Sequence, residues 1–156
     1  MTAEQFSDAV GNVVWPIFAD SMVRYKPLFK IKNMDEPFVN RASLVQNNTF
    51  LTALGRPNRE TVSTSRESQA NLLQALELTN GTRFIDALKK GSERWTAKYP
   101  RNEELIKAIY TKSLLRLPEQ DELKLAIKLY SESSRTEATE DLLWAIVLLP
   151  EFQLIY

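Results

Sequence analysis

The chain has 156 residues, of which 44% are hydrophobic and 26% charged, so its length and composition fit one globular domain. Twenty basic residues balance twenty acidic ones, and a net charge of zero argues against a general nucleic-acid-binding protein, which normally carries a basic excess. Only four glycines interrupt segments rich in Leu, Ala, Glu and Lys, which favours helix. We therefore predict a single helical domain over residues 1–156.

Cysteine and histidine are both absent from the sequence. A c-type haem needs Cys-x-x-Cys-His, a structural zinc site needs Cys or His, and a Ser-His-Asp centre needs an imidazole. We therefore predict no metal ligand, no cofactor site and no catalytic residue in this chain. The longest strongly apolar run, residues 142–149, is far shorter than the roughly 20 residues that span a bilayer, so no transmembrane segment is expected either.

The start of the chain carries a helix signal. Thr2 with Gln5 matches a capping box, and apolar residues follow at helical spacing until Trp15-Pro16 ends the helix near Val14. The sequence does not predict the conformation of residues 16–54. Pro27 and Pro37 interrupt residues 16–40, and residues 38–54 fit either a short extended piece or a strained helix.

A bend is predicted where Gly55 and Pro57 bracket Arg56. A helix then follows, with Leu72, Leu73 and Leu76 near one face. This helix is predicted to end at Asn80-Gly81, with the left-handed backbone conformation that commonly ends a helix. Thr82 is then expected to cap the next helix.

Four further helices complete the predicted fold. A short helix is expected to end near Gly91, and another to begin with Asn102 as its cap. A third is expected to begin at Pro118, to carry Leu123, Ala126, Ile127 and Tyr130 on one face, and to pair antiparallel with the helix before it. In the last helix, residues 142–149 are apolar on every face, so we expect neighbouring helices to enclose it and Trp144→Ala to cost ~3–5 kcal/mol. The predicted fold class is all-α, an irregular helical bundle of about six or seven helices with a long loop between the first helix and the central helix.

Several segments resemble, in order, the motifs of the PSD-type domain of unknown function. The central three are Arg41-Ala42-Ser43-Leu44-Val45, Leu54-Gly55-Arg56-Pro57-Asn58-Arg59-Glu60 and Leu73-Gln74-Ala75-Leu76-Glu77-Leu78-Thr79-Asn80-Gly81. The opening Thr2-Ala3-Glu4-Gln5-Phe6-Ser7-Asp8-Ala9 and the closing Asp141-Leu142-Leu143-Trp144-Ala145-Ile146 through Glu151-Phe152 look like its first and last motifs.

That domain closes large planctomycete and related bacterial proteins, whose N-terminal part often carries a cytochrome c-like module. The resemblance implies that this chain is the C-terminal fragment of a multidomain protein whose location is extracytoplasmic, in the periplasm or at the cell surface. Any haem would then lie in an upstream domain. The resemblance brings no catalytic residue.

One group of residues is a candidate ligand site, which we call the arginine-rich loop: Arg41, Arg56, Asn58, Arg59 and Arg66. Guanidinium forks on a proline-stiffened loop suit carboxylate or sulfate groups, as in an anionic polysaccharide. Alternatively, these arginines pair with Glu60, Glu67 and Glu77 or bond helix carbonyls, and so anchor the loop to the helices, which is the interpretation we favour.

The sequence thus leaves three interpretations of function. The leading one is a noncatalytic helical module that packs against the other domains of a large exported protein. The alternatives are binding of an anionic polysaccharide or another anionic ligand through the arginine-rich loop, and a standalone scaffold. Enzymatic activity is left uncertain and not favoured, because no spacing singles out a carboxylate pair such as Glu60 and Glu67.

Overall fold

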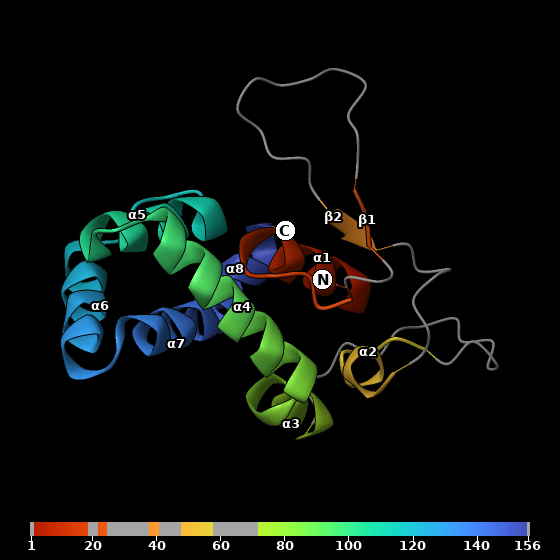
Figure 1. Cartoon of the computed structure of the whole chain (residues 1–156). Coiled ribbons are helices and arrows are strands. Elements are labelled where there is room, and N and C mark those ends of the chain that lie inside the picture. Colours follow the sequence, from red (N-terminus) through yellow and green to blue (C-terminus); the bar gives the residue numbers. More distant parts are fainter. Residues whose placement is uncertain (1, 19–21, 25–37, 41–47, 58–71, 156) are drawn as a thin grey trace, which may run out of the picture. The chain divides into compact units, whose positions relative to one another are not determined.

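The computed structural model describes residues 2–18, 22–24, 38–40, 48–57 and 72–155 (Figure 1). In this part of the chain, eight helices and one pair of short strands confirm the all-α prediction, with slightly more helices than expected. The elements, in chain order, are α1 (Ala3–Val13), β1 (Met22–Arg24), β2 (Phe38–Asn40), α2 (Thr49–Ala53), α3 (Leu72–Asn80), α4 (Thr82–Lys98), α5 (Asn102–Leu114), α6 (Gln120–Glu132), α7 (Arg135–Leu148) and α8 (Pro150–Ile155).

The chain divides into two compact units. The first unit comprises Met1–Asn12 and Pro16–Ile85, and the second unit comprises Val13–Trp15 and Asp86–Tyr156. Each unit has its own set of buried apolar side chains. The assignment of residues 1–156 to one domain stays a prediction.

In the first unit, α1 begins with the predicted capping box. The Thr2 amide donates to Gln5 Oε1 at 2.8 Å, and the Gln5 amide donates to Thr2 Oγ1 at 3.2 Å. The region expected to be a long loop contains β1, β2 and α2. The two strands are antiparallel, with Val23 opposite Val39.

The described core of the first unit includes three phenylalanines from separate segments. The ring of Phe50 on α2 lies 6.1 Å from that of Phe18, edge to face, and 6.3 Å from that of Phe84, stacked. Phe50 and Phe84 are fully buried. Residues distant in the sequence therefore meet in one apolar cluster.

The face of α3 that carries the predicted leucine stripe is exposed. Leu72 is 86% exposed, and Leu73 and Leu76 are exposed as well. Leu78 is instead the buried residue of this helix, which packs against α2. The helical spacing correctly placed these leucines on one face of α3, but it did not identify the side of the helix that packs against α2.

The corner between α3 and α4 also differs from the prediction. Gly81 does not have a positive φ, so it is not a left-handed stop. Its carbonyl accepts from the Phe84 and Ile85 amides, which makes Gly81 the residue that caps α4, while Thr82 is the first residue of that helix. Glycine is needed because a Cβ here would lie 2.3 Å from the Glu77 carbonyl oxygen.

In the second unit, α4 runs through Gly91 rather than ending there. A Cβ at position 91 would lie 2.5 Å from Val14 Cγ1, so this glycine permits close packing against Val14. The prediction that a helix ends near Gly91 was wrong. The sequence alone does not distinguish a glycine that permits a close packing contact from a glycine that ends a helix.

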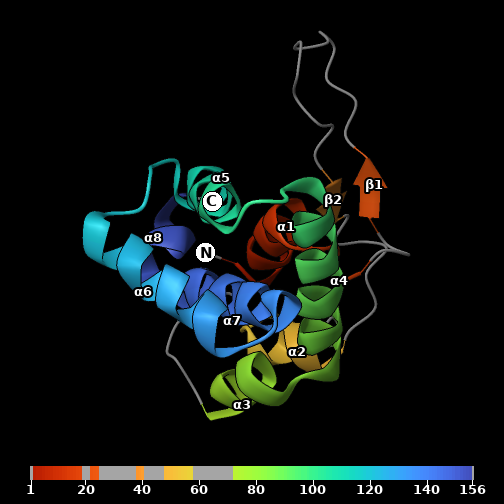
Figure 2. The ribbon, with the colours of Figure 1, turned by 60° about the vertical axis from the view of Figure 1, so that its left-hand side comes forward.

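Helix α7 packs against α5, α6 and α8 (Figure 2). Its buried apolar residues are Leu142, Leu143, Ile146 and Val147. Trp144, however, is 37% exposed, and Ala145 is exposed too. The prediction that neighbours enclose α7 on every side was therefore wrong for this face. No helix in the described ranges has the length and apolar character that a membrane span requires.

Candidate functional site

Arg56 is positioned by the end of α2. Asn48 caps the start of this helix by accepting from the Leu51 amide at 3.0 Å. At the other end, Gly55 has a φ of 83° and the Arg56 amide donates to the Leu51 carbonyl at 2.9 Å. This arrangement is a Schellman-type helix end, for which glycine is the preferred residue. It confirms the predicted bend and fixes the backbone of Arg56.

The Arg56 side chain points into the first unit rather than toward water. Arg56 is only 6% exposed, and its Nε lies 3.3 Å from Oε1 of Glu4, in the first turn of α1. Because both charges are largely shielded from water, their attraction is stronger than that of a surface pair. Arg56 therefore anchors the turn after α2 to the start of α1.

The other members of the arginine-rich loop lie outside the described residues, namely Arg41, Asn58, Arg59 and Arg66. The ligand-binding prediction for the loop stays a prediction. For Arg56 itself, the pairing with Glu4 favours the anchoring interpretation over ligand binding.

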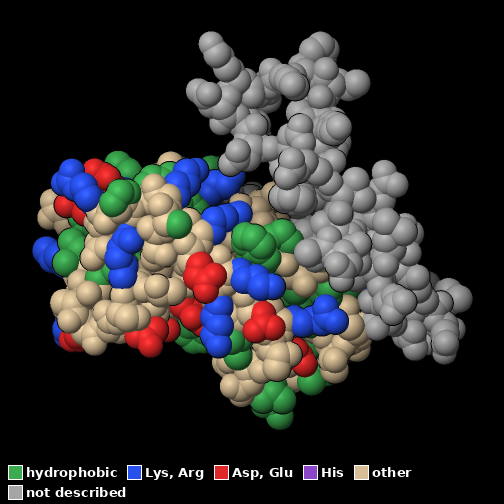
Figure 3. All heavy atoms as spheres, viewed as in Figure 1, with side chains coloured by type: hydrophobic (Ala, Val, Ile, Leu, Met, Phe, Trp, Pro, Cys, Tyr) green, Lys and Arg blue, Asp and Glu red, His purple; other side chains and the backbone are tan. Residues whose placement is uncertain are grey.

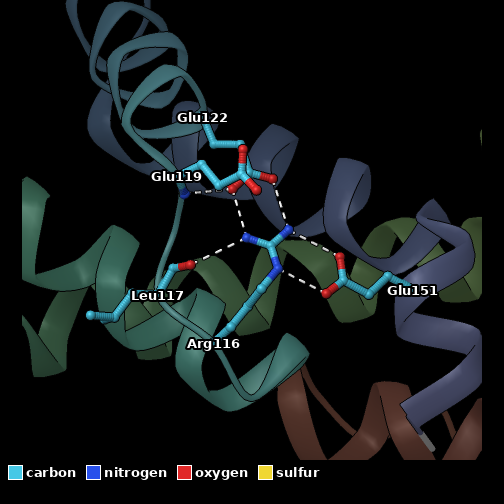
Figure 4. A network of polar contacts seen from close by, with 5 residues as sticks. All are labelled: Arg116, Leu117, Glu119, Glu122 and Glu151. Atoms are coloured by element: carbon cyan, nitrogen blue, oxygen red, sulfur yellow. Dashed lines mark hydrogen bonds and ion pairs between the residues drawn. The ribbon is translucent and has the colours of Figure 1, made fainter.

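A cluster that the sequence did not predict surrounds Arg116 (Figure 4). Its guanidinium forms one fork with Glu122, at 2.7 and 2.9 Å, and a second fork with Glu151, at 2.8 and 3.0 Å. Nη1 also donates to the Leu117 carbonyl at 3.2 Å. Glu122 in turn accepts from the Glu119 amide at the start of α6. All five N–H donors of the guanidinium are thus occupied.

The Arg116 cluster shifts the protonation of its members. Hydrogen bonds from Arg116 are the main reason that the pKa values of Glu122 and Glu151 lie below the ordinary carboxyl value. The same bonds raise the pKa of Arg116. The two carboxylates are therefore ionised, and the Arg116 cation between them has no unused N–H donor. Their contacts join the α5–α6 connection to α8. None of these three side chains is poised for proton transfer.

Arg135 is the centre of a second group of hydrogen bonds that the sequence did not predict. Its Nε donates to Asn102 Oδ1 at 2.7 Å, Nη1 donates to the Thr96 carbonyl at 3.0 Å, and Nη2 donates to the Tyr99 carbonyl. Asn102 was expected to cap α5, but the capping residue is Arg101. The start of α7 is thereby tied to the end of α4.

The end of α1 is held by side chains of α4. Trp95 Nε1 and Arg94 Nη2 both donate to the Val13 carbonyl, at 2.8 and 3.0 Å. The Arg94 guanidinium also lies 5.9 Å from the Trp15 ring. These contacts satisfy a helix-end carbonyl that would otherwise need water.

One face of the described residues shows no concentrated charge. On the face drawn in Figure 3, basic and acidic side chains are interspersed rather than segregated. Among the described residues, no three acidic side chains are grouped in a way that could hold a metal ion.

Comparison with known proteins places the chain in a family. Residues 35–130, more than half of the chain, match the family model PSD1, described as a protein of unknown function (DUF1553). The chain belongs to the PSD1 family. The search of curated proteins and the search of solved structures each found no match.

The stretch matched by the PSD1 model is tied to helices outside it. Arg56 lies within residues 35–130, whereas its partner Glu4 precedes them. Arg116 also lies within them, whereas Glu151 follows them. The folded part of this PSD1 protein therefore extends into α1 and α8.

Sequence reasoning missed the Arg116 cluster for a physical reason. Only the Glu119 and Glu122 spacing, typical of a capping box, gave a local signal there. Glu151 lies on a distant helix, so its pairing with Arg116 depends on how α8 packs.

Proposed function

We propose that this member of the PSD1 family is a noncatalytic helical module that packs against the other domains of a larger exported bacterial protein. The observation that carries the proposal is a set of leucines on the described surface. Leu72 and Leu76 are exposed in the first unit, and Leu115, Leu117 and Leu154 are exposed in the second. Burying such side chains against another domain is favourable by ~1.5–3 kcal/mol each when burial is complete.

The described arginine clusters support the noncatalytic part of the proposal. Arg56 pairs with Glu4, and all N–H donors of Arg116 bond within the chain. These groups stabilise the fold, and the chain supplies no histidine or cysteine for the common nucleophilic or metal-dependent reactions. Catalysis and any haem would then belong to upstream domains in an extracytoplasmic parent protein.

The test measures binding between the isolated chain and the rest of the parent protein by calorimetry. Two double variants, Leu72→Glu with Leu76→Glu and Leu115→Glu with Leu117→Glu, place charges on exposed positions. At least one of these two double variants should bind the rest of the parent protein more than tenfold more weakly, while the melting temperature of the chain is unchanged. Thr79→Glu, at an exposed polar position of α3, is the control. Unaltered binding in both variants, or no binding by the unmodified chain, would contradict the proposal.

A second candidate function is binding of an anionic polysaccharide through the arginine-rich loop. It is favoured by the sequence, in which Arg56, Arg59 and Arg66 belong to or follow the turn at Gly55 and Pro57, and Arg41 precedes it. Because Arg56 is already paired with Glu4, the guanidinium groups of Arg59 and Arg66 would bind the anionic groups of the polysaccharide. A stable Arg59→Ala, Arg66→Ala variant that loses affinity for a sulfated glycan would support this function over the first. A native gene that encodes this chain alone would instead favour a standalone scaffold.

A further inference from the structure

The corner between α3 and α4 contains a reactive pair of residues. Asn80 is the last residue of α3, its side chain is exposed, and Gly81 follows it. It is the only asparagine followed by glycine in the sequence. Among the described residues no hydrogen bond holds its side-chain amide.

We propose that Asn80 is a site of spontaneous deamidation controlled by the opening of α3. The Gly81 backbone nitrogen attacks Cγ of Asn80, and the side-chain nitrogen leaves as ammonia together with the proton lost by Gly81. A five-membered succinimide remains, and one water molecule opens it to aspartate or isoaspartate. Glycine favours the attack because it has no side chain to hinder the ring.

The folded corner restrains this reaction. The Gly81 N–H donates to the Glu77 carbonyl at 2.9 Å, so the nitrogen is engaged while the last turn of α3 is intact. That turn should open easily, because Leu78 is the buried residue of a nine-residue helix whose other leucines are exposed. The rate of conversion should therefore equal the rate in an unfolded peptide multiplied by the fraction of open molecules.

The product would weaken the same corner. A new carboxylate at position 80 would stand at the C-terminal end of α3, where the helix dipole disfavours negative charge. The Glu77 carboxylate is already close, since its Oε2 would lie 2.8 Å from a Cβ at Gly81. Gly81 cannot readily be replaced to slow the reaction, because that Cβ would collide with the Glu77 carbonyl.

The test incubates the full chain at mildly alkaline pH and locates deamidated sites by peptide mass mapping. Asn80 should convert ahead of every other asparagine in the described residues, more slowly than in a synthetic peptide of residues 75–86. Asn80→Gln should lose the signal, since glutamine would have to form a larger ring. An Asn80 that stays intact in the folded chain while the peptide converts completely would overturn the proposal.

A second variant tests whether opening of α3 controls the rate of deamidation at Asn80. Leu78→Ala removes the buried side chain of the helix without altering residues 79–82, so it should accelerate conversion at least tenfold in the folded chain. The same substitution in the peptide should leave the rate unchanged. Equal rates for Leu78→Ala and the unmodified folded chain would show that opening of α3 does not control the reaction.

Discussion

Arg56 and Glu4 form an ion pair, with 3.3 Å between Nε and Oε1, that joins the turn after α2 to the first turn of α1. Arg56 is held at a helix end by the left-handed Gly55, and Glu4 stands near the positive end of α1. A long stretch of chain separates these residues. Their contact therefore fixes two distant parts of the first unit to each other.

Arg56→Ala should destabilise the protein by about 3 kcal/mol, because it leaves the shielded Glu4 carboxylate without this cation. Chemical denaturation measures the effect. Arg56→Lys should be intermediate, since it keeps the charge but loses the planar fork. The control is Arg101→Ala, whose pair with Glu104 is exposed and should matter by less than about 0.5 kcal/mol. Equal effects at positions 56 and 101 would show that Arg56 is not an anchor.

The Arg116 cluster should make stability fall in acid. Arg116 lowers the folded-state pKa values of Glu122 and Glu151 below their ordinary value of 4.5. The stabilisation is therefore present above about pH 4.5 and is lost as the pH falls through the lower folded-state values. Arg116→Met should cost about 1 kcal/mol at neutral pH, because the cluster is partly open to solvent.

A pH series of urea melts compares Arg116→Met with the unmodified chain. The difference in unfolding free energy should shrink as both carboxylates protonate. A constant difference down to pH 2–3 would mean that Arg116 contributes through packing on Tyr110, whose ring centroid lies 5.6 Å away, rather than through its ion pairs.

Within α7, Leu143→Ala should be more damaging than Trp144→Ala. Leu143 is fully buried, and its truncation should cost about 2–5 kcal/mol. Trp144 is partly exposed, so its truncation should cost less than the ~3–5 kcal/mol expected for a buried tryptophan. Equilibrium urea unfolding of the two variants gives the order. A larger loss for Trp144→Ala would mean that this face of α7 is covered.

A chain that ends at residue 130, the end of the PSD1 match, should not fold. It lacks α7, whose four buried aliphatic side chains together contribute an amount comparable to a whole domain stability of about 5–15 kcal/mol. Circular dichroism and binding of an apolar dye should report lost helix and exposed core. A chain ending at residue 149 keeps α7 and should retain most helix. Native-like melting of the shorter chain would contradict this prediction.

The sequence predicted features that depend on neighbouring residues. The capping box of Thr2 and Gln5 and the bend at Gly55 are set by local hydrogen bonds and backbone preferences, and both are present. Periodicity also located most helices. These signals act within a few residues, so no tertiary information was needed.

Features that depend on packing were missed. Gly91 lies inside α4 because Val14 approaches it, and Gly81 is required by the nearby Glu77 carbonyl rather than by a positive φ. The exposure of Trp144 depends on which neighbours cover α7. In the arginine-rich loop, Arg56 anchors a turn as the favoured interpretation expects, but its ion-pair partner is Glu4 rather than Glu60, Glu67 or Glu77. Spacing along the sequence could not single out Glu4 from among twenty acidic residues.

Hydrogen exchange over residues 72–80 tests the proposed packing function most directly. The amides of α3 are followed by mass spectrometry in the isolated chain and in the whole parent protein. If another domain covers the exposed leucines of α3, exchange should be at least tenfold slower in the parent protein. Equal exchange of α3 and of the surface around Leu115 and Leu154 in both samples would contradict the account.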